Sequence, residues 1–126
     1  MPAPPQGMSD PRIKSRRVQT TNATPTPIVN RMVPGGTALL ITVYVTGRKQ
    51  LAGPARAAYI RNALVHRAPA GSATMQGPVN TVFTRESDSA WDCTIDVTGN
   101  NWRCMVTGAA AATIDWHCRF EIVRAP

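Results

Sequence analysis

The sequence predicts an all-β protein, an antiparallel β-sandwich or jelly roll with an extended N-terminal arm. Two observations predict it. The last third of the chain alternates apolar and polar residues with a period of two, the pattern of strands that bury one face. The beginning of the chain lacks this alternation and is rich in proline and arginine. We therefore expect two parts, an arm over residues 1–30 and a β-domain over residues 31–126.

The predicted arm has little apolar surface. Such a segment cannot bury enough apolar area to fold alone, and its prolines cannot donate hydrogen bonds to a sheet. Its cations are candidate contacts with the carboxylates or phosphates of a partner. These candidate partner-binding residues are Arg12, Lys14, Arg16, Arg17 and Arg31. The alternative is a solvated tail, as many proline-rich termini are.

Four segments before the C-terminal third are expected to be strands. Residues 37–47 form a long one, with Leu39, Ile41, Val43 and Val45 on one side. Residues 57–67 have the alanines and leucine of a helix, but neighbouring strands and flanking prolines favour a strand. Shorter strands are expected over 72–76 and 80–85. With the three strands described next, the total is seven or eight, without a helix.

The C-terminal third predicts a three-stranded antiparallel meander. Its inward residues are Trp91, Cys93, Ile95 and Val97, then Trp102, Cys104 and Val106, then Ile114, Trp116, Cys118, Phe120 and Ile122. A two-residue turn at Gly99-Asn100 would place Val97 opposite Trp102 and Ile95 opposite Cys104. A register shifted by one residue is strongly disfavoured, because it would move charged side chains into the core. The three tryptophans are therefore expected to line one core.

The three cysteines all lie on these inward faces. An odd number without CxxC spacing argues against a disulfide framework and against a zinc site. In the predicted register Cys93 and Cys104 are not directly opposite. We expect three buried thiols that act as small apolar groups in a chain folded in a reducing cytosol.

No catalytic motif stands out. Asp115 and His117 share the outward face of one strand, where a polar row is favoured over an acid–base pair. Glu86 and Asp88 lie in a polar loop without EF-hand spacing, which favours a capped turn over a cation site. The sequence has no HExxH motif, Walker loop or nucleophile elbow. We therefore expect no enzyme, no cofactor and no metal.

Charge and hydropathy limit the partners. The net charge is +7, but the arginines outside the arm are scattered, and no recognition helix accompanies them. Nucleic acid is therefore not an expected partner. No apolar run reaches the roughly 20 residues that span a bilayer, and the N-terminus lacks the apolar stretch of a signal peptide, so no membrane is expected.

Several motifs occur in order: TTNATPTPI at 20–28, AWDCTIDVTGNN at 90–101 and MVTGAAAATIDWHCRFEI at 105–122. Together they resemble β-domains in virion structural proteins of tailed bacteriophages. The resemblance implies a non-enzymatic virion protein that is assembled in the host cytoplasm. It also implies a homo-oligomer, a trimer or dimer, that binds the major capsid protein or another virion protein.

Two virion roles follow from this resemblance. A capsid decoration or cement protein would stabilise the shell through its β-body and its N-terminal arm. The alternative is a tail or head fibre or spike component that contacts the host surface. The short chain, without repeats or a coiled coil, favours cement. A third hypothesis is a cytosolic β-sandwich that binds an acidic protein or DNA.

Overall fold

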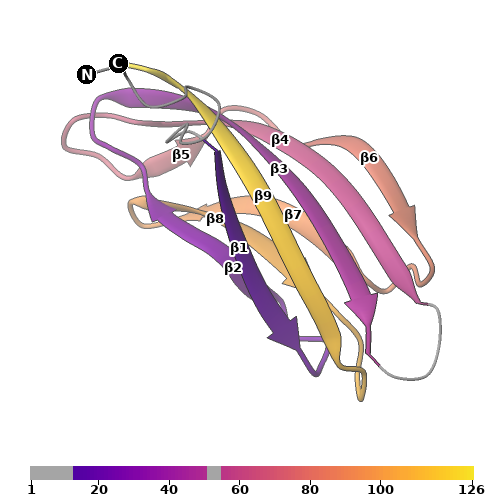
Figure 1. The fold of residues 1–126 in the computed structure, drawn as a ribbon. Coiled ribbons are helices and arrows are strands. Elements are labelled where there is room, and N and C mark those ends of the chain that lie inside the picture. The colour runs from indigo at the N-terminus through magenta and orange to yellow at the C-terminus, as the bar shows by residue number, and fades with distance from the viewer. Residues whose placement is uncertain (1–12, 51–54) are drawn as a thin grey trace, which may run out of the picture.

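The computed structural model describes residues 13–50 and 55–126. Over these residues the chain forms nine strands and no helix, which confirms the all-β class (Figure 1). The strands are β1 (Ile13–Thr20), β2 (Thr26–Met32), β3 (Thr37–Lys49), β4 (Arg56–Arg67), β5 (Ala73–Met75), β6 (Asn80–Glu86), β7 (Asp92–Thr98), β8 (Asn101–Thr107) and β9 (Ile114–Ala125). The ambiguous segment 57–67 is thus a strand, as predicted.

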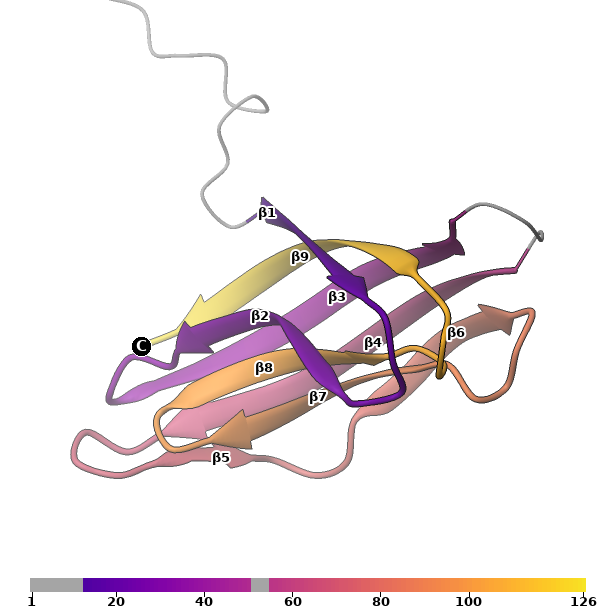
Figure 2. The ribbon, with the colours of Figure 1, turned by 90° about the horizontal axis from the view of Figure 1, so that it is seen from below.

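The strands form two antiparallel sheets that pack face to face (Figures 1 and 2). The larger sheet has the order β1-β9-β3-β4, and the far edge of β4 is shared by two short partners. β5 pairs with the C-terminal end of β4, and β6 pairs with its N-terminal half. The smaller sheet has the order β2-β8-β7. The architecture is an antiparallel β-sandwich.

The predicted arm over residues 1–30 needs a correction, because β1 and β2 belong to the sandwich. β1 pairs with β9 from Ile13 opposite Glu121 to Thr20 opposite Ile114, and β2 pairs with β8. Proline is tolerated because β2 is an edge strand with a register irregularity after Pro27. The expected boundary at residue 30 therefore falls inside β2. Residues 1–12 lie outside the described part of the chain.

The hairpin of β7 and β8 has the predicted register. Val97 lies opposite Trp102, and Ile95 lies opposite Cys104. The third strand of the expected meander is placed differently, because β9 lies in the larger sheet between β1 and β3. Alternation shows which face of a strand is buried, but either sheet of a sandwich can cover that face. The meander is therefore corrected to a hairpin followed by a crossing strand.

The three tryptophans lie in one core, as predicted. Trp91, Trp102 and Trp116 are at most 2% exposed. The Trp116 ring stacks on Tyr59 at 6.4 Å and meets Trp91 edge-on at 5.7 Å between centroids. Its Nε1–H donates to Oγ1 of Thr20 at 2.9 Å. Trp116 therefore joins both sheets and anchors β1.

One charged residue, Arg61 on β4, also lies between the sheets with 4% exposure. Its Nε donates to the carbonyl of Cys93 on β7 at 2.9 Å, and its Nη1 donates to the carbonyl of Phe83 on β6 at 2.7 Å. Its guanidinium lies 4.9 Å from the centre of the Tyr59 ring. Arg61 thus links β4 to β6 and to the opposite sheet.

The three cysteines are buried thiols, as expected. The Sγ atoms of Cys93 and Cys104 are 3.8 Å apart, although the two residues are not directly opposite in the ladder. Hydrogen bonds with Cys118 and Cys93, together with burial, raise the pKa of the Cys104 thiol. Cys104 therefore stays protonated at neutral pH and packs as an apolar group.

Gly47 gives Trp116 its place in the core. The two residues are cross-strand partners, and a Cβ at Gly47 would lie 2.6 Å from the indole ring. We expect Gly47→Ala to lower the free energy of unfolding by roughly 1–3 kcal/mol, because the packed ring cannot move aside. Urea unfolding measures this loss. The neighbouring, outward-facing Thr46→Ala is the control and should change stability by less than about 0.5 kcal/mol. Equal stability of the two variants would contradict the packing described here.

Candidate ligand-binding groove

The basic residues predicted as partner contacts do not form one cluster. Lys14, Arg16 and Arg17 lie on β1, Arg31 lies on β2, and Arg12 is outside the described residues. The guanidinium groups of Arg16 and Arg31 lie 5.7 Å and 5.5 Å from the centre of the buried Phe120 ring. Arg17 points to the outer face of the larger sheet, opposite His117. The structure therefore brings Arg16 and Arg31 together at the edge of the core and leaves Arg17 exposed.

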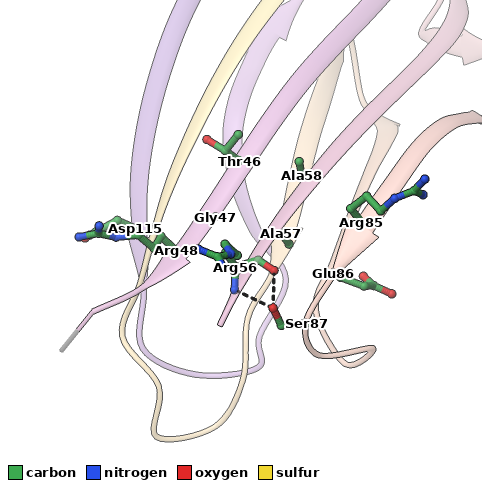
Figure 3. A pocket seen from close by; sticks show the side chains of 10 residues that line it. All are labelled: Thr46, Gly47, Arg48, Arg56, Ala57, Ala58, Arg85, Glu86, Ser87 and Asp115. Atoms are coloured by element: carbon green, nitrogen blue, oxygen red, sulfur yellow. Dashed lines mark hydrogen bonds between the residues drawn. The ribbon is translucent and has the colours of Figure 1, made fainter. Parts of the chain in front are cut away.

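A groove of about 670 Å³ lies where β3 ends and β4 begins (Figure 3). Strands of the larger sheet and the end of β6 supply its lining: Thr46, Gly47, Arg48, Arg56, Ala57, Ala58, Arg85, Glu86, Ser87 and Asp115. The outward-facing members of this set are not covered by the smaller sheet. The groove is open to ligands from the outer side of the sandwich.

Strand register places three arginines around this groove. Arg48 on β3 lies directly opposite Arg56 on β4, and Arg85 on β6 lies opposite Ala58, two residues further along β4. The only ion pair between described residues joins Arg103 and Asp96, so no described carboxylate lies within ion-pair distance of a groove arginine, although Asp115 and Arg48 attract each other across the β9–β3 ladder. The groove therefore presents guanidinium groups to anions.

The position of Arg56 and Arg85 is supported by local contacts. The backbone N–H of Arg56 donates to Oγ of Ser87 at 3.1 Å, and the Ser87 hydroxyl donates to the Arg56 carbonyl at 3.0 Å (Figure 3). The Arg85 guanidinium lies 5.0 Å from the centre of the Phe83 ring. The contacts of Arg56 use no donor of its guanidinium, whereas Nη1 of Arg85 donates to the Thr84 carbonyl at 2.9 Å.

Asp115 on β9 adds a carboxylate to the groove. Its Oδ1 accepts a hydrogen bond from Gln19 at 3.0 Å, and its Oδ2 accepts one from Gln50 at 2.7 Å. These two bonds, with the charge of Arg48, hold the pKa of Asp115 below its usual 3.8. Asp115 is therefore ionised at neutral pH, and each oxygen keeps a lone pair for a ligand donor.

The other acid of the groove, Glu86, is already engaged. Its Oε2 accepts a hydrogen bond from the Tyr59 hydroxyl at 2.7 Å. Burial, the hydrogen bond to Glu86 and the charge of that residue raise the pKa of Tyr59. Glu86 thus fixes the tip of β6 against β4, while Asp115 is the acid of the groove whose two oxygens are oriented by glutamines.

The lowered pKa of Asp115 can be measured directly. We expect an NMR titration of its carboxyl group to give a value below 3.8, because both amide donors favour the charged form. Gln50→Ala should raise the pKa, and Gln76→Ala, an exposed glutamine elsewhere, should not. The stabilisation from this group is present above the unfolded pKa and is lost as the pH falls through the lower folded pKa. An unchanged pKa in Gln50→Ala would contradict the assigned hydrogen bond.

The other polar residues singled out from the sequence have local hydrogen-bond partners. Both oxygens of Asp115 bind glutamines rather than His117, so the polar-row interpretation of this strand is favoured. Oδ1 of Asp88 accepts the N–H of Ala90 at 2.9 Å, which is the expected capped turn before Trp91. Residues 13–50 and 55–126 contain no group of three or more metal-binding side chains. They also contain no helix long and apolar enough to cross a membrane.

The arginines of the groove were missed at the sequence level, where they counted as scattered charges. Arg48 and Arg56 flank the connection between two predicted strands, so a hairpin register could have placed them opposite each other. Arg85 could not be placed, because the pairing of β6 with β4 contains a register irregularity at Ile60 and Arg61. Asp115 was recognised only as a member of a polar row.

No family model matches the sequence, and no curated protein matches it either. Solved structures of similar fold include tailspike proteins of Acinetobacter phages. The tailspike of phage vB_ApiP_P1 is 8% identical with a TM-score of 0.50, and the match covers 89% of this chain and 22% of that chain. The tailspike of A. baumannii phage AM24 is 6% identical with a TM-score of 0.46, over 94% of this chain and 27% of that chain.

A third similar structure is the tailspike of A. baumannii bacteriophage Fri1, which is described as a capsular polysaccharide depolymerase. It is 14% identical with a TM-score of 0.43, over 86% of this chain and 17% of that chain. The present chain therefore spans about a quarter or less of the length of these tailspikes. At such identities the likeness is one of fold.

These similarities bear on two expectations. The vB_ApiP_P1 tailspike shares the fold of this chain, and neither it nor the other two similar structures is described as a decoration or cement protein. The exclusion of an enzyme is overturned, because one protein of similar fold is described as a depolymerase. The absence of familiar catalytic motifs is no ground for excluding activity in such a fold.

Proposed function

We propose that this chain is a β-sandwich part of a phage tail component, a tailspike or fibre, that contacts the surface of the host bacterium through the groove. The observation that carries the proposal is the set of three arginines, Arg48, Arg56 and Arg85, which line an open groove with no described carboxylate within ion-pair distance. Similarity in fold to the vB_ApiP_P1 tailspike supports a tail location over the capsid shell.

The strand arrangement suits a binding surface. The groove residues lie on neighbouring hydrogen-bonded strands, β9, β3, β4 and β6, so their backbones are fixed before a ligand arrives. A site on such strands loses little conformational entropy on binding. In this proposal the exposed Arg17 on the outer face of β1 stays available for a contact with another virion protein or with a second copy of the chain.

The proposal is tested by cell binding. The full chain, fused to a fluorescent protein, is incubated with a panel of encapsulated Acinetobacter strains and their capsule-deficient mutants. We expect flow cytometry to show saturable staining of at least one encapsulated strain and loss of staining in its capsule-deficient mutant. Saturable binding to isolated phage heads, with no staining of any strain, would contradict the proposal and favour capsid decoration.

A further inference from the structure

We infer that the groove binds an acidic saccharide, with its carboxylate held by the arginines and its hydroxyl groups donating to Asp115. This inference rests on the proposed function, because it names the class of ligand bound in the groove through which we propose that the chain contacts the host. It follows from the order of charges along the groove, from the way each charged group is held, and from the ligands that this order disfavours.

The charges follow one row across three strands. Asp115 on β9 lies directly opposite Arg48 on β3, and Arg48 lies directly opposite Arg56 on β4. Directly opposed residues of an antiparallel pair have their Cβ atoms about 5 Å apart. Arg85 on β6 lies off this row, opposite Ala58, and its guanidinium points away from Arg48 and Arg56 (Figure 3). A ligand lying across the strands therefore meets a hydrogen-bond acceptor first and cationic donors next.

The arginines fit a carboxylate. A guanidinium presents a planar fork of N–H donors that matches the two oxygens of a carboxylate. Arg48 and Arg56 are exposed, and no described carboxylate lies within ion-pair distance of either. A carboxylate placed between them would meet two guanidinium groups whose backbones are already fixed by the β3–β4 ladder.

Asp115 fits a hydroxyl-bearing ligand. Gln19 and Gln50 each occupy one of its oxygens with a single hydrogen bond, so both oxygens are oriented and each retains acceptor capacity. The ordinary ligand donors that meet an ionised carboxylate are hydroxyl and amide groups. Vicinal hydroxyls of a sugar ring supply two such donors at a spacing that a carboxylate can accept.

The mixed row disfavours the other ligand classes. A polyphosphate or nucleic-acid backbone is anionic throughout, so it would place phosphate charge against the ionised Asp115. A neutral saccharide would leave the three guanidinium groups without an anionic partner. A sugar that carries a carboxylate beside its hydroxyls matches both ends of the row.

Binding of defined polymers by the full chain tests this assignment. The probes are oligosaccharides of polygalacturonate, alginate and polysialate, with dextran as the neutral polymer and inorganic polyphosphate as the phosphate polymer. We expect calorimetry to detect binding of at least one acidic saccharide and none of dextran. Each of Arg48→Gln and Arg56→Gln should weaken that binding about tenfold, the usual effect of losing one charge-assisted hydrogen bond. Arg85→Gln should weaken it less, because the Arg85 guanidinium already donates to the Thr84 carbonyl. The exposed Arg124→Gln at the opposite end of the sheet removes the same charge and should leave binding unchanged.

The Asp115→Asn variant distinguishes a site for acidic saccharides from a site for anions in general. It should weaken binding of the acidic saccharide, because an ionised acceptor is lost, and strengthen binding of polyphosphate, because a repulsive charge is lost. Binding of none of the acidic saccharides would overturn the inference. Tighter binding of polyphosphate than of any saccharide by the unmodified chain would overturn it as well. All of these side chains are exposed, so the variants should fold, which circular dichroism checks.

Cell staining distinguishes a failure of this inference from a failure of the proposed function. If the variant with all three arginines replaced stains encapsulated cells as strongly as the unmodified chain, the ligand assignment is wrong and host contact occurs through another surface of the chain. If the unmodified chain binds an acidic saccharide but stains no encapsulated strain, the groove assignment stands and the proposed function is wrong.

Discussion

Replacement of Trp116 by alanine is expected to lower the free energy of unfolding by about 3–5 kcal/mol. The indole is 1% exposed and packs against Tyr59 and Trp91 between the two sheets. Its loss leaves a cavity next to Gly47, which has no side chain to fill the space. The hydroxyl of Thr20 also loses its indole donor, so the attachment of β1 should weaken with the core.

Guanidinium unfolding followed by circular dichroism measures this loss. Since small domains are stable by only about 5–15 kcal/mol, Trp116→Phe is included as a milder variant that should fold and still show a reduced midpoint. Val123→Ala on the same strand is the control, because that side chain is 59% exposed. A loss below about 1 kcal/mol in Trp116→Ala would mean that the ring does not fill the space between the sheets.

Replacement of Arg61 by alanine is expected to lower the free energy of unfolding by roughly 3–5 kcal/mol, mainly through lost hydrogen bonds. The carbonyls of Cys93 and Phe83 would lose charged donors, and a buried acceptor without a partner costs about 1–3 kcal/mol. The cation above the Tyr59 ring would be lost as well. The links from β4 to β6 and to β7 should loosen together.

Two further variants separate the hydrogen bonds of Arg61 from its volume. Arg61→Lys keeps the charge but not the planar fork, so it should recover part of the loss. Arg61→Met keeps apolar volume and removes the cost of burying a charge, yet it satisfies neither carbonyl, so it should remain at least about 1 kcal/mol less stable than the unmodified chain. If Arg61→Met equals the unmodified chain in unfolding midpoint, the hydrogen bonds contribute nothing net. Arg124→Met controls for loss of a surface charge.

The strands that could be predicted are those whose alternation is local. The inward residues of β7 and β8 were identified from period-two alternation, and a two-residue turn then left one register that keeps charges out of the core. β3 was identified in the same way. Such predictions succeed because a strand with one buried face carries its pattern in consecutive residues, and a tight turn sets its partner.

β1 and β2 were not predicted, because their prolines and arginines have the composition of an arm. Both occupy sheet edges, where one side of the backbone needs no partner, and the long side chains of Arg16 and Arg31 reach over Phe120. Arg61 was counted among the scattered charges, yet it lies in the core because carbonyls of two other strands accept its donors. In each case a contact distant in sequence outweighs the local preference.

Alternation is a local property of the chain, and it was enough to establish antiparallel strands with three tryptophans and three cysteines facing inward. The placement of β9 in the larger sheet and the meeting of Asp115, Arg48, Arg56 and Arg85 at one groove became visible only in the folded molecule. Strands pair so that whole faces of the sandwich are buried, and this pairing depends on residues far apart in the chain.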